Sequence, residues 1–530
     1  MSATLARLIA AADDRAAQPL AGLAARLGAE VTADATEVAV RGVAFDSREV
    51  QPGNVFVAIP GARADGHDHL AAAAAAGAVA AIVERRLDVA LPQLVVEHSR
   101  PALATAACWW YGDPSAELGV VGITGTDGKT TTSYLATAAL EAAGVPTGML
   151  GTAALEVGDT REPNPEHATT PEAPRLQAIL RAMVTAGDRA AVVETTSHAL
   201  ALDRVAGVRY DVAILTNLTS EHLELHGTWE AYRDAKRSLF DRLAVGADNP
   251  AKPDPGWPRT GIVNAMDPSA EVFVEATQRA SARVVTYSAN RQRWPADVVA
   301  TNIMIGRLGG GLRLWYATPR GDGQLRSKLS GGFNIHNLLA VIALGEALGL
   351  DPAAIQGGLE SVERVPGRME RIVAGQPFEV VVDFAHTAAS LEGVLAELKR
   401  QPGRGQLIAV FGSAGERDTE KRPDMGRVAA RRADVVILTD EDPRGEDPGS
   451  ILAEIAVGAE AGGKVRGRDL LLIADRRAAI RAAFERARPG DVVLLAGKGH
   501  ERTIEYADHD EPWDEAAEAR TALAQLGFEG

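Results

Sequence analysis

Cysteine is almost absent from this sequence. Cys108 is the single cysteine in a chain of 530 residues, so no disulfide can form within the chain and no zinc ribbon can be built. A chain without disulfides fits a reducing compartment, and we expect a cytoplasmic protein. Cys108 itself is interpreted as a small buried hydrophobic side chain.

Long hydrophobic runs are also missing. The longest uncharged apolar stretch extends only from Leu70 to Val83, well short of the ~20 residues that cross a bilayer. It predicts a helix followed by a strand, and no membrane partner is expected. At the N-terminus, Asp13 and Asp14 stand where a signal peptide needs its apolar run.

Positive charge is in deficit. The chain has 55 lysines and arginines against 71 aspartates and glutamates, which gives a net charge of −16. Because phosphate backbones select basic faces, no nucleic-acid partner is expected, although a local basic pocket could still hold a small anion. The apolar share of 46% suffices for real cores, and a prior of about 150 residues per domain gives three or four domains.

Two changes in composition suggest the domain boundaries. A turn cluster at 111–115 follows a helical stretch, and Val-Pro-Gly-Arg at 365–368 follows a helical pattern over 351–363. We therefore expect domains at 1–114, 115–364 and 365–530. Short β-branched runs alternate with helical patterns, such as 133–143, which favours an α/β fold with parallel sheets. The expected strands are 118–123, 190–193, 212–215, 379–382, 406–411, 434–439 and 491–495.

The strongest local signal is a glycine-rich loop between an apolar strand and a helix, Gly-Ile-Thr-Gly-Thr-Asp-Gly-Lys-Thr-Thr at 122–131. Glycines let backbone N–H groups surround phosphate oxygens, and the helix N-terminus adds partial positive charge. Lys129 can reach the β and γ phosphates, and Thr130 can offer its hydroxyl to Mg²⁺. Ile123 stands where the strict Walker pattern has glycine, so the loop is a variant. The residues expected to bind ATP here are Gly125, Thr126, Asp127, Gly128, Lys129, Thr130 and Thr131.

Polar segments follow the next two predicted strands. One is Glu-Thr-Thr-Ser-His at 194–198, and the other is a loop at 216–227 that carries His222. A carboxylate at a strand end, downstream of a phosphate loop, is a natural Mg²⁺ ligand. Lys236 lies further on, in a predicted helix. Taken alone, a histidine in a polar loop or a lysine on a helix has no special meaning, but here they occur in combination.

The order of these motifs resembles the Mur ligase family. The phosphate loop is similar to that of Mur ligases and folylpolyglutamate synthases, with Asp127 where the family usually has asparagine. The segments at 194–198, 216–227 and 235–236 resemble the family's metal and lysine motifs. The resemblance implies a three-domain architecture with a central P-loop, parallel-sheet ATPase domain and a C-terminal Rossmann-like domain. It also implies Mg²⁺ as cofactor, with Thr130, Glu194, His222 and a CO₂-carbamylated Lys236 as ligands, and Lys129, Lys236 and His222 as catalytic residues.

Three further motifs resemble the family's nucleotide contacts. They are Gly-Phe-Asn-Ile-His-Asn at 332–337, Val-Pro-Gly-Arg-Met-Glu at 365–370 and Asp-Phe-Ala-His-Thr at 383–387. The resemblance implies that Asn337 contacts the adenine, that Arg368 reaches the nucleotide and that Asp383 lies near the ribose. Each motif alone would be an ordinary turn or helix cap, and it is their order and spacing that make the resemblance.

The first domain resembles that of the family members that add the third, diamino residue of the peptidoglycan precursor. Asp-Ser-Arg at 46–48 and Asp-Gly-His at 65–67 carry this part of the resemblance. It implies a monomer that binds ATP, a diamino acid and UDP-MurNAc-L-Ala-D-Glu. The residues implied to bind the UDP substrate are Ser47, Ala62, Arg63, Ala64, Thr169, Thr170, Thr196 and Arg204.

The last domain resembles the amino-acid site of the same members, through motifs at 412–418, 439–444 and 497–501. Two cues within it conflict. Arg444 can grip a distal carboxylate, as on meso-diaminopimelate. Asp442, where the diaminopimelate-type motif has asparagine, adds negative charge that favours the bare ammonium of lysine or ornithine, and this second reading is slightly preferred. The residues implied to hold the amino acid are Arg417, Glu441, Asp442, Pro443, Arg444, Gly497 and Glu501.

The implied reaction passes through an acyl phosphate. The γ-carboxylate of D-glutamate attacks the γ-phosphate of ATP, and the amine of the diamino acid then displaces phosphate. The alternatives are a ligase that adds D-Ala-D-Ala, a folylpolyglutamate synthase, and a nucleotide switch or inactive scaffold. The motifs at 441–444 and 497–501 argue against the first two, and a switch has no use for an acceptor pocket in the third domain.

Overall fold

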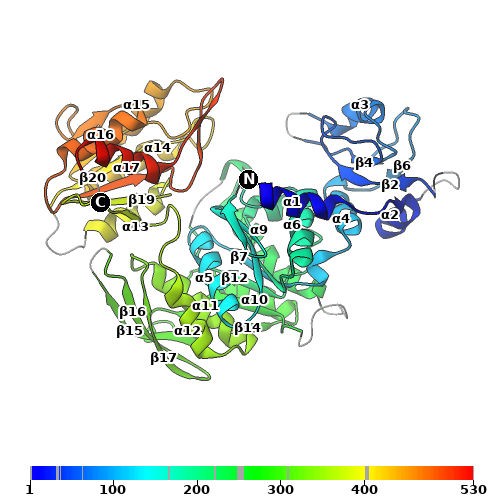
Figure 1. Ribbon diagram of the computed structural model, residues 1–530, viewed down its shortest axis with the longest axis horizontal. Helices are drawn as coiled ribbons and strands as arrows, with labels where there is room; N and C mark the ends of the chain where they lie inside the picture. Colours follow the sequence, from blue (N-terminus) through cyan, green and yellow to red (C-terminus); the bar gives the residue numbers. More distant parts are fainter. Residues whose placement is uncertain are drawn as a thin grey trace.

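The computed structural model of the protein describes residues 3–30, 35, 37–61, 64–164, 168–219, 223–246, 256–306, 309–399 and 405–528. Within them lie three α/β units, each built around its own main sheet (Figure 1). This confirms the expected α/β fold with three domains, while the exact boundaries at 114 and 364 stay predictions. Among the described residues, none of the helices combines the length and apolar character needed to cross a bilayer.

The first unit is a parallel four-stranded sheet in the order β3-β4-β5-β6. Its strands carry buried apolar side chains such as Val55, Ile82 and Leu94, over which helices α2 and α4 pack. The helix and strand expected over 70–83 are both present. The elements are α2 (Leu20–Leu27), β3 (Gly42–Ala44), β4 (Asn54–Val57), η2 (Gly66–His69), α3 (Leu70–Ala75), β5 (Ala80–Val83), β6 (Gln93–Val95) and α4 (Ser99–Tyr111), with a small ribbon of β1 (Gln18–Pro19) and β2 (Ala39–Val40).

The central unit is an eleven-stranded sheet in the order β10-β9-β8-β11-β7-β12-β13-β14-β15-β16-β17. The strands from β8 to β15 run parallel, and both edges end in antiparallel strands. The central strands are fully buried, as is usual where helices cover both faces. The strands are β7 (Gly119–Thr124), β8 (Thr147–Leu150), β9 (Ala154–Val157), β10 (Thr160–Pro163), β11 (Ala190–Glu194), β12 (Val212–Leu215), β13 (Thr260–Asn264), β14 (Arg283–Ser288), β15 (Val298–Ile305), β16 (Leu312–Thr318) and β17 (Gly321–Ser327).

Two separate cores lie on the two faces of this sheet. The core on one face contains residues of α5, α11 and α12, and the core on the other contains residues of α6, α9, α10 and the N-terminal helix α1. The helices are α1 (Ala3–Asp13), η3 (Pro114–Ala116), α5 (Lys129–Ala142), α6 (Ala173–Ala186), α7 (Ser197–Ala201), α8 (Leu223–His226), α9 (Trp229–Asp241), η4 (Arg242–Gly246), α10 (Ala270–Arg279), α11 (Asn334–Leu348) and α12 (Pro352–Ser361).

The third unit is a six-stranded sheet in the order β18-β19-β23-β20-β21-β22, parallel except for the edge strand β18. Helices cover both of its faces, with α13, α14 and α15 on one core and α16 and α17 on the other. The elements are β18 (Glu370–Ile372), β19 (Glu379–Asp383), α13 (Ala388–Lys399), β20 (Leu407–Phe411), α14 (Lys421–Arg432), β21 (Val435–Leu438), α15 (Pro448–Ala461), β22 (Leu470–Leu472), α16 (Arg476–Arg486), β23 (Val492–Ala496), β24 (Thr503–Glu505), β25 (Asp510–Pro512) and α17 (Glu515–Gln525).

The strands expected from the sequence are all present, with ends that differ by at most one residue. The helix expected over 133–143 begins earlier, at Lys129, because Gly128 adopts a left-handed φ of 86° and starts it directly after the phosphate loop. In Figure 1 the first and third units lie on opposite sides of the central unit. A site shared by the central and third units can therefore form where the phosphate loop faces the third unit.

Candidate active site

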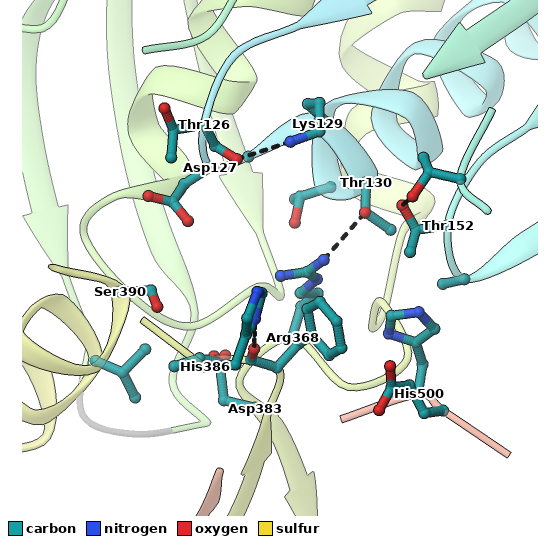
Figure 2. Close-up of a pocket in the computed structure, with 18 of the residues that line it drawn as sticks. Thr126, Asp127, Lys129, Thr130, Thr152, Arg368, Asp383, His386, Ser390 and His500 are labelled. Atoms are coloured by element: carbon teal, nitrogen blue, oxygen red, sulfur yellow. Dashed lines mark hydrogen bonds between the residues drawn. The ribbon is translucent and has the colours of Figure 1, made fainter. Parts of the chain in front are cut away.

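A cavity of about 590 Å³ opens between the central and third units. Its walls come from loops that follow β7, β8, β11, β19 and β23, at the carboxyl ends of these strands, where parallel sheets bind ligands (Figure 2). Many residues that the sequence pointed to line it together. They are Thr126, Asp127, Gly128, Lys129, Thr130, Thr131, Thr169, Thr196, Asn337, Arg368, Asp383, Arg417, Asp442 and Glu501.

The phosphate loop leaves no room for side chains at its two key glycines. Gly125 has a φ of 146° and Gly128 a φ of 86°, both in the region that favours glycine. A Cβ atom at Gly128 would lie 2.5 Å from Oδ1 of Asn337. Asn337 in turn accepts a hydrogen bond from the hydroxyl of Thr132 at 3.2 Å, so the loop and α11 fix each other.

The two lysines predicted to be catalytic meet at one backbone carbonyl. The Nζ of Lys129 donates to the carbonyl oxygens of Gly125 at 2.9 Å and of Thr126 at 2.7 Å. The Nζ of Lys236, on α9, donates to the same Gly125 oxygen at 2.7 Å. Lys236 is buried, with its ammonium 4.6 Å from the ring centroid of Tyr232. The predicted helix therefore delivers Lys236 to the phosphate loop.

Glu194 is fully buried directly behind the loop. Its Oε2 accepts hydrogen bonds from the hydroxyls of Thr130 at 3.2 Å and Thr152 at 2.8 Å, and its Oε1 accepts one from the backbone N–H of Thr152 at 2.9 Å. A carboxylate and a hydroxyl that share this position suit a hard cation such as Mg²⁺. His222, the third predicted ligand, lies outside the described residues. Within the described part of the chain, no group of three or more His, Cys, Asp or Glu side chains gathers as a metal site.

Arg368 connects the third unit to the phosphate loop. Its Nη2 donates to the hydroxyl of Thr130 at 3.2 Å, and its guanidinium lies 4.8 Å from the ring centroid of Phe384 (Figure 2). The same ring contacts His386 and His500, with centroids 4.6 Å and 4.8 Å away. Burial, together with the charge of Arg368, lowers the pKa of His500 to about 3, so this imidazole is neutral at physiological pH.

Asp383 closes the β19 end of the cavity. Its two carboxylate oxygens accept backbone hydrogen bonds from Met369 at 2.8 Å and from Ala385 at 2.9 Å. Burial raises the pKa of Asp383, although the nearby Arg368 acts against this. The carboxylate thereby fixes the two segments that carry Arg368 and Phe384.

A second polar cluster forms the third-unit end of the cavity. The Nζ of Lys498 contacts Asp442 at 2.8 Å and Glu501 at 2.6 Å. Burial alone would lower the pKa of Lys498, but the charges of Glu501 and Asp442 raise it. Burial raises the pKa of Glu501 to about 7, an effect that Lys498 opposes. The charge of Asp442 is thus partly compensated, which weakens the argument that Asp442 by itself selects an amine.

The remaining predicted amino-acid residues lie behind this wall. The Nε of Arg444 pairs with Oε2 of Glu505 at 2.7 Å. Glu441 packs against Gly497, where an added Cβ would lie 2.9 Å from Oε2 of Glu441. Pro443, in the same segment, is also buried.

Arg476 fixes the backbone of the segments that carry this cluster. Its Nη1 donates to the carbonyl of Asp440 at 2.9 Å, and its Nη2 donates to the carbonyl of Ala496 at 2.7 Å. Arg476 and Glu515 are both fully buried and pair at 2.7 Å. The ends of β21 and β23, which carry the motifs at 439–444 and 497–501, are held together in this way.

The residues predicted to bind the UDP substrate are divided between two places. The hydroxyl of Thr170 donates to the backbone carbonyl of Glu194 at 2.7 Å, and Nη1 of Arg204 donates to the carbonyl of Thr170 at 3.0 Å. Thr169 and Thr196 line the cavity beside the phosphate loop, whereas Thr170 and Arg204 do not, although the hydroxyl oxygens of Thr170 and Thr196 lie 3.4 Å apart. Ser47 and Ala64 belong to the first unit and do not line the cavity. Ala62 and Arg63 lie outside the described residues.

Several site residues were not assigned from the sequence. Thr152 carried no motif, and it follows strand β8, which was not among the strands expected from the sequence. Phe384, Lys498 and His500 stood inside quoted motifs without a role. Arg476 had no signal at all, because its partners Asp440, Ala496 and Glu515 are brought together only by the fold.

The fold and this cavity define a nucleotide-binding α/β enzyme in which a phosphate loop faces a Rossmann-like unit. Family models match three stretches: "Mur ligase family, catalytic domain" at 39–107, "Mur ligase middle domain" at 123–345 and "Mur ligase, glutamate ligase domain" at 367–499. The chain belongs to the Mur ligase family. It is accordingly an ATP-dependent ligase that forms an amide bond, as the sequence predicted.

Similar proteins cover nearly the whole chain. The UDP-N-acetylmuramyl-tripeptide synthetase of Roseiflexus sp. is 48% identical over 93% of this chain and 96% of its own length. The UDP-N-acetylmuramoyl-L-alanyl-D-glutamate--2,6-diaminopimelate ligase of Bacillus velezensis is 40% identical over 92% of this chain and 95% of its own length. A solved structure of a ligase with that same name superposes with a TM-score of 0.65 at 31% identity, and the match covers 95% of this chain and 99% of that one.

Proposed function

We propose that the protein adds a diamino acid to the γ-carboxylate of D-glutamate in UDP-MurNAc-L-Ala-D-Glu, in peptidoglycan biosynthesis. The observation that carries this proposal is that a single cavity joins the phosphate loop to the third-unit cluster of the buried Asp442 and Lys498 with the half-buried Glu501. A nucleotide at one end and an amino acid at the other would meet at the wall formed by Thr169 and Thr196. Relatives named as tripeptide synthetases and diaminopimelate ligases support the same reaction.

ATP would bind with its phosphates in the loop at the N-terminus of α5. Backbone N–H groups and the helix dipole favour anionic oxygens there. Lys129 and Arg368 approach from the central and third units and would neutralise the charge that accumulates on the γ-phosphate. Asn337 and Asp383, which line the same cavity, would contact the adenosine part.

Magnesium would be held by Thr130, Glu194, His222 and Lys236, the last as a carbamate. When bound, Mg²⁺ supplies charge neutralisation at the phosphates. The position of Lys236 supports the modification, because two ammonium groups otherwise share the Gly125 carbonyl at 2.9 Å and 2.7 Å. Reaction of the neutral Lys236 amine with CO₂ forms an N–C bond and releases a proton. The product is a carbamate anion, so the repulsion between the Lys129 and Lys236 ammonium groups is replaced by attraction between Lys129 and the carbamate.

The chemistry would proceed in two displacements. The D-glutamate γ-carboxylate, oriented by Thr170, Thr196 and Arg204, attacks the γ-phosphate, which gives an acyl phosphate and ADP. The uncharged amine of the diamino acid then attacks the acyl carbon, phosphate leaves and the amine loses a proton. The enclosing loops of two units would keep water from hydrolysing the acyl phosphate. Catalysis is therefore mostly positioning and charge neutralisation.

The direct test is to incubate the protein with ATP, Mg²⁺, UDP-MurNAc-L-Ala-D-Glu and each diamino acid, and to measure ADP and the product mass. Lys129→Ala should reduce ligation by about 100-fold or more. The exposed Lys328, changed to alanine, is the matched control and should retain activity. A Lys129→Ala protein with full ATP-dependent ligation would contradict the scheme. Turnover of D-Ala-D-Ala or a folate acceptor, with none of the diamino acids, would overturn the substrate assignment.

A further inference from the structure

The third-unit end of the cavity is rich in carboxylates. Asp442, Glu501 and Glu505 all line it, and the buried Lys498 contacts two of them at 2.8 Å and 2.6 Å. Behind this wall, Oε2 of Glu441 is buried and accepts no hydrogen bond from the described residues. Two other cations line this end of the cavity, but Arg502 is paired with Asp514 and Arg417 is exposed, so Lys498 is the buried cation that faces these carboxylates.

Arg444 could pair with the distal carboxylate of an incoming amino acid, but its guanidinium is already paired with Glu505. The Nε of Arg444 pairs with Oε2 of Glu505 at 2.7 Å, and Nη1 donates to the carbonyl of Gly415 at 3.2 Å. Glu505 lines the cavity and Arg444 does not. The side chain of Arg444 is only 15% exposed, against 31% for Glu505.

The backbone holds this pair in place. The N–H of Arg444 donates to the carbonyl of Glu505 at 2.9 Å, and the N–H of Glu505 donates to Oδ1 of Asp442 at 2.9 Å. Arg444 itself has a φ of 53°, an uncommon conformation for a residue other than glycine. Strand β24 and the loop after β21 thus present Glu505 to the cavity as a fixed element.

We propose that Glu505 is a specificity-determining residue that occupies the Arg444 guanidinium and turns the distal end of the amino-acid site into a cation site. The protein would then add a diamino acid that ends in an ammonium group without a neighbouring carboxylate, of the lysine or ornithine type. A distal carboxylate, as on diaminopimelate, would meet Asp442, Glu501 and Glu505 and would have to displace Glu505 from Arg444. Placing like charges together in this way is costly. This inference rests on the proposed function.

The test compares kcat/KM for L-lysine, L-ornithine and meso-diaminopimelate. We expect the wild-type enzyme to favour lysine or ornithine over diaminopimelate by at least about tenfold. Glu505→Gln keeps the shape of the side chain but removes its charge. It should raise kcat/KM for diaminopimelate and reduce the ratio of kcat/KM for lysine or ornithine to kcat/KM for diaminopimelate by about tenfold. Glu511→Gln, on the partner strand of the same hairpin and paired with Arg477, is the matched control and should leave the ratio unchanged.

The outcomes separate the two proposals. A wild-type preference for diaminopimelate, or an unchanged ratio in Glu505→Gln, overturns the role of Glu505 while ligation itself stands. Absence of turnover with every diamino acid overturns the proposed function. If Glu505→Gln does not fold, calorimetric titration of the wild-type enzyme with each amino acid, in the presence of UDP-MurNAc-L-Ala-D-Glu and a non-hydrolysable ATP analogue, decides the question, because tighter binding of diaminopimelate contradicts the inference.

Discussion

Thr152 illustrates what a single hydroxyl contributes to this site. It donates to Oε2 of Glu194 at 2.8 Å from its side chain and to Oε1 at 2.9 Å from its backbone. The carboxylate is thereby held in one orientation, pointed at Thr130. A buried carboxylate that serves a cation needs this kind of support, because its own conformational freedom would otherwise weaken binding.

Replacing Thr152 with valine should impair the reaction without unfolding the protein. Valine keeps the volume but loses the hydroxyl donor to Glu194, a charge-assisted hydrogen bond whose loss should lower kcat about tenfold and raise the Mg²⁺ concentration needed for half activity. Steady-state rates across a Mg²⁺ titration measure both effects. Thr152→Ser restores the donor and should behave like the wild type. Equal Mg²⁺ dependence in the valine variant and the wild type would show that Thr152 does not orient Glu194.

The sequence predicted those site residues that share a short motif. Lys129 and Thr130 follow from the loop pattern, and Glu194 follows from its place at a strand end. Thr152 could not be found, because its partner is set by the parallel pairing of β8 with β11, which no local pattern encodes. The Arg444–Glu505 pair was not predicted for the same reason, since it joins the loop after β21 to strand β24, 61 residues further along the chain.

At the scale of elements, buried parallel strands were the easiest to predict. Strands such as β12 and β20 are continuous apolar runs, because helices cover both faces. The parallel strands β8 and β13 were not among the expected strands, although both are fully buried. Strands β15, β16 and β17, at the edge of the central sheet where the pairing becomes antiparallel, were not expected either. Their side chains alternate between buried and exposed or carry many polar residues, as in β17, so they do not form apolar runs. The helix start at Lys129 was also missed, because it depends on the conformation of Gly128 and not on hydrophobic periodicity.

Asp188, in the turn between α6 and β11, should make stability depend on pH. Burial raises its pKa from 3.8 to about 6, although the N–H of Gly158 donates to Oδ2 at 3.0 Å. The folded state holds this proton more tightly than the unfolded state, so stability is lost as pH rises from 3.8 through about 6. Asp188→Asn should therefore stabilise the protein at pH 8 by about 1 kcal/mol, less than the full shift because solvent screens part of it.

Thermal unfolding at two pH values checks the effect of Asp188. The gain in Tm of the asparagine variant should be present at pH 8 and much smaller near pH 4, where the folded-state carboxyl is protonated and the unfolded-state carboxyl, with its pKa of 3.8, is partly protonated. Asp159→Asn, in the neighbouring β-turn and exposed, is the control and should show a smaller change. A gain that is the same at both pH values would mean that the charge of Asp188 is not its cause.

The Arg476–Glu515 pair should be the most sensitive ionic contact of the third unit. Both side chains are fully buried, and Arg476 also supports the carbonyls of Asp440 and Ala496. Arg476→Met leaves Glu515 as an uncompensated buried charge, which should cost about 3–5 kcal/mol of unfolding free energy, measured by urea denaturation. The double variant with Glu515→Gln should recover part of this loss. Arg466→Met removes an exposed pair with Glu460 and should cost less than about 1 kcal/mol.

At the scale of the whole molecule, the site depends on how two units are held against each other. The loop of the central unit and the β19 end of the third unit meet through the Arg368–Thr130 hydrogen bond at 3.2 Å. Arg368 also contacts Phe384, so the bridge extends into the third unit. A nucleotide bound between Lys129 and Arg368 would add contacts to both sides. Its binding free energy would therefore stabilise the interface as well as the loop.

Hydrogen exchange with a non-hydrolysable ATP analogue tests this coupling. In the wild type, the analogue should slow amide exchange both in the loop at 125–131 and in the third-unit segment at 383–390. Arg368→Ala should keep protection of the loop, which Lys129 and the helix N-terminus still provide, but lose it at 383–390. Arg364→Ala removes an exposed arginine that pairs with Glu370. In this control variant, the analogue should slow amide exchange in both segments as it does in the wild type. Undiminished protection at 383–390 in Arg368→Ala would show that the units are coupled without this bridge, and the third unit would then respond to nucleotide through Asp383 or the Phe384 ring instead.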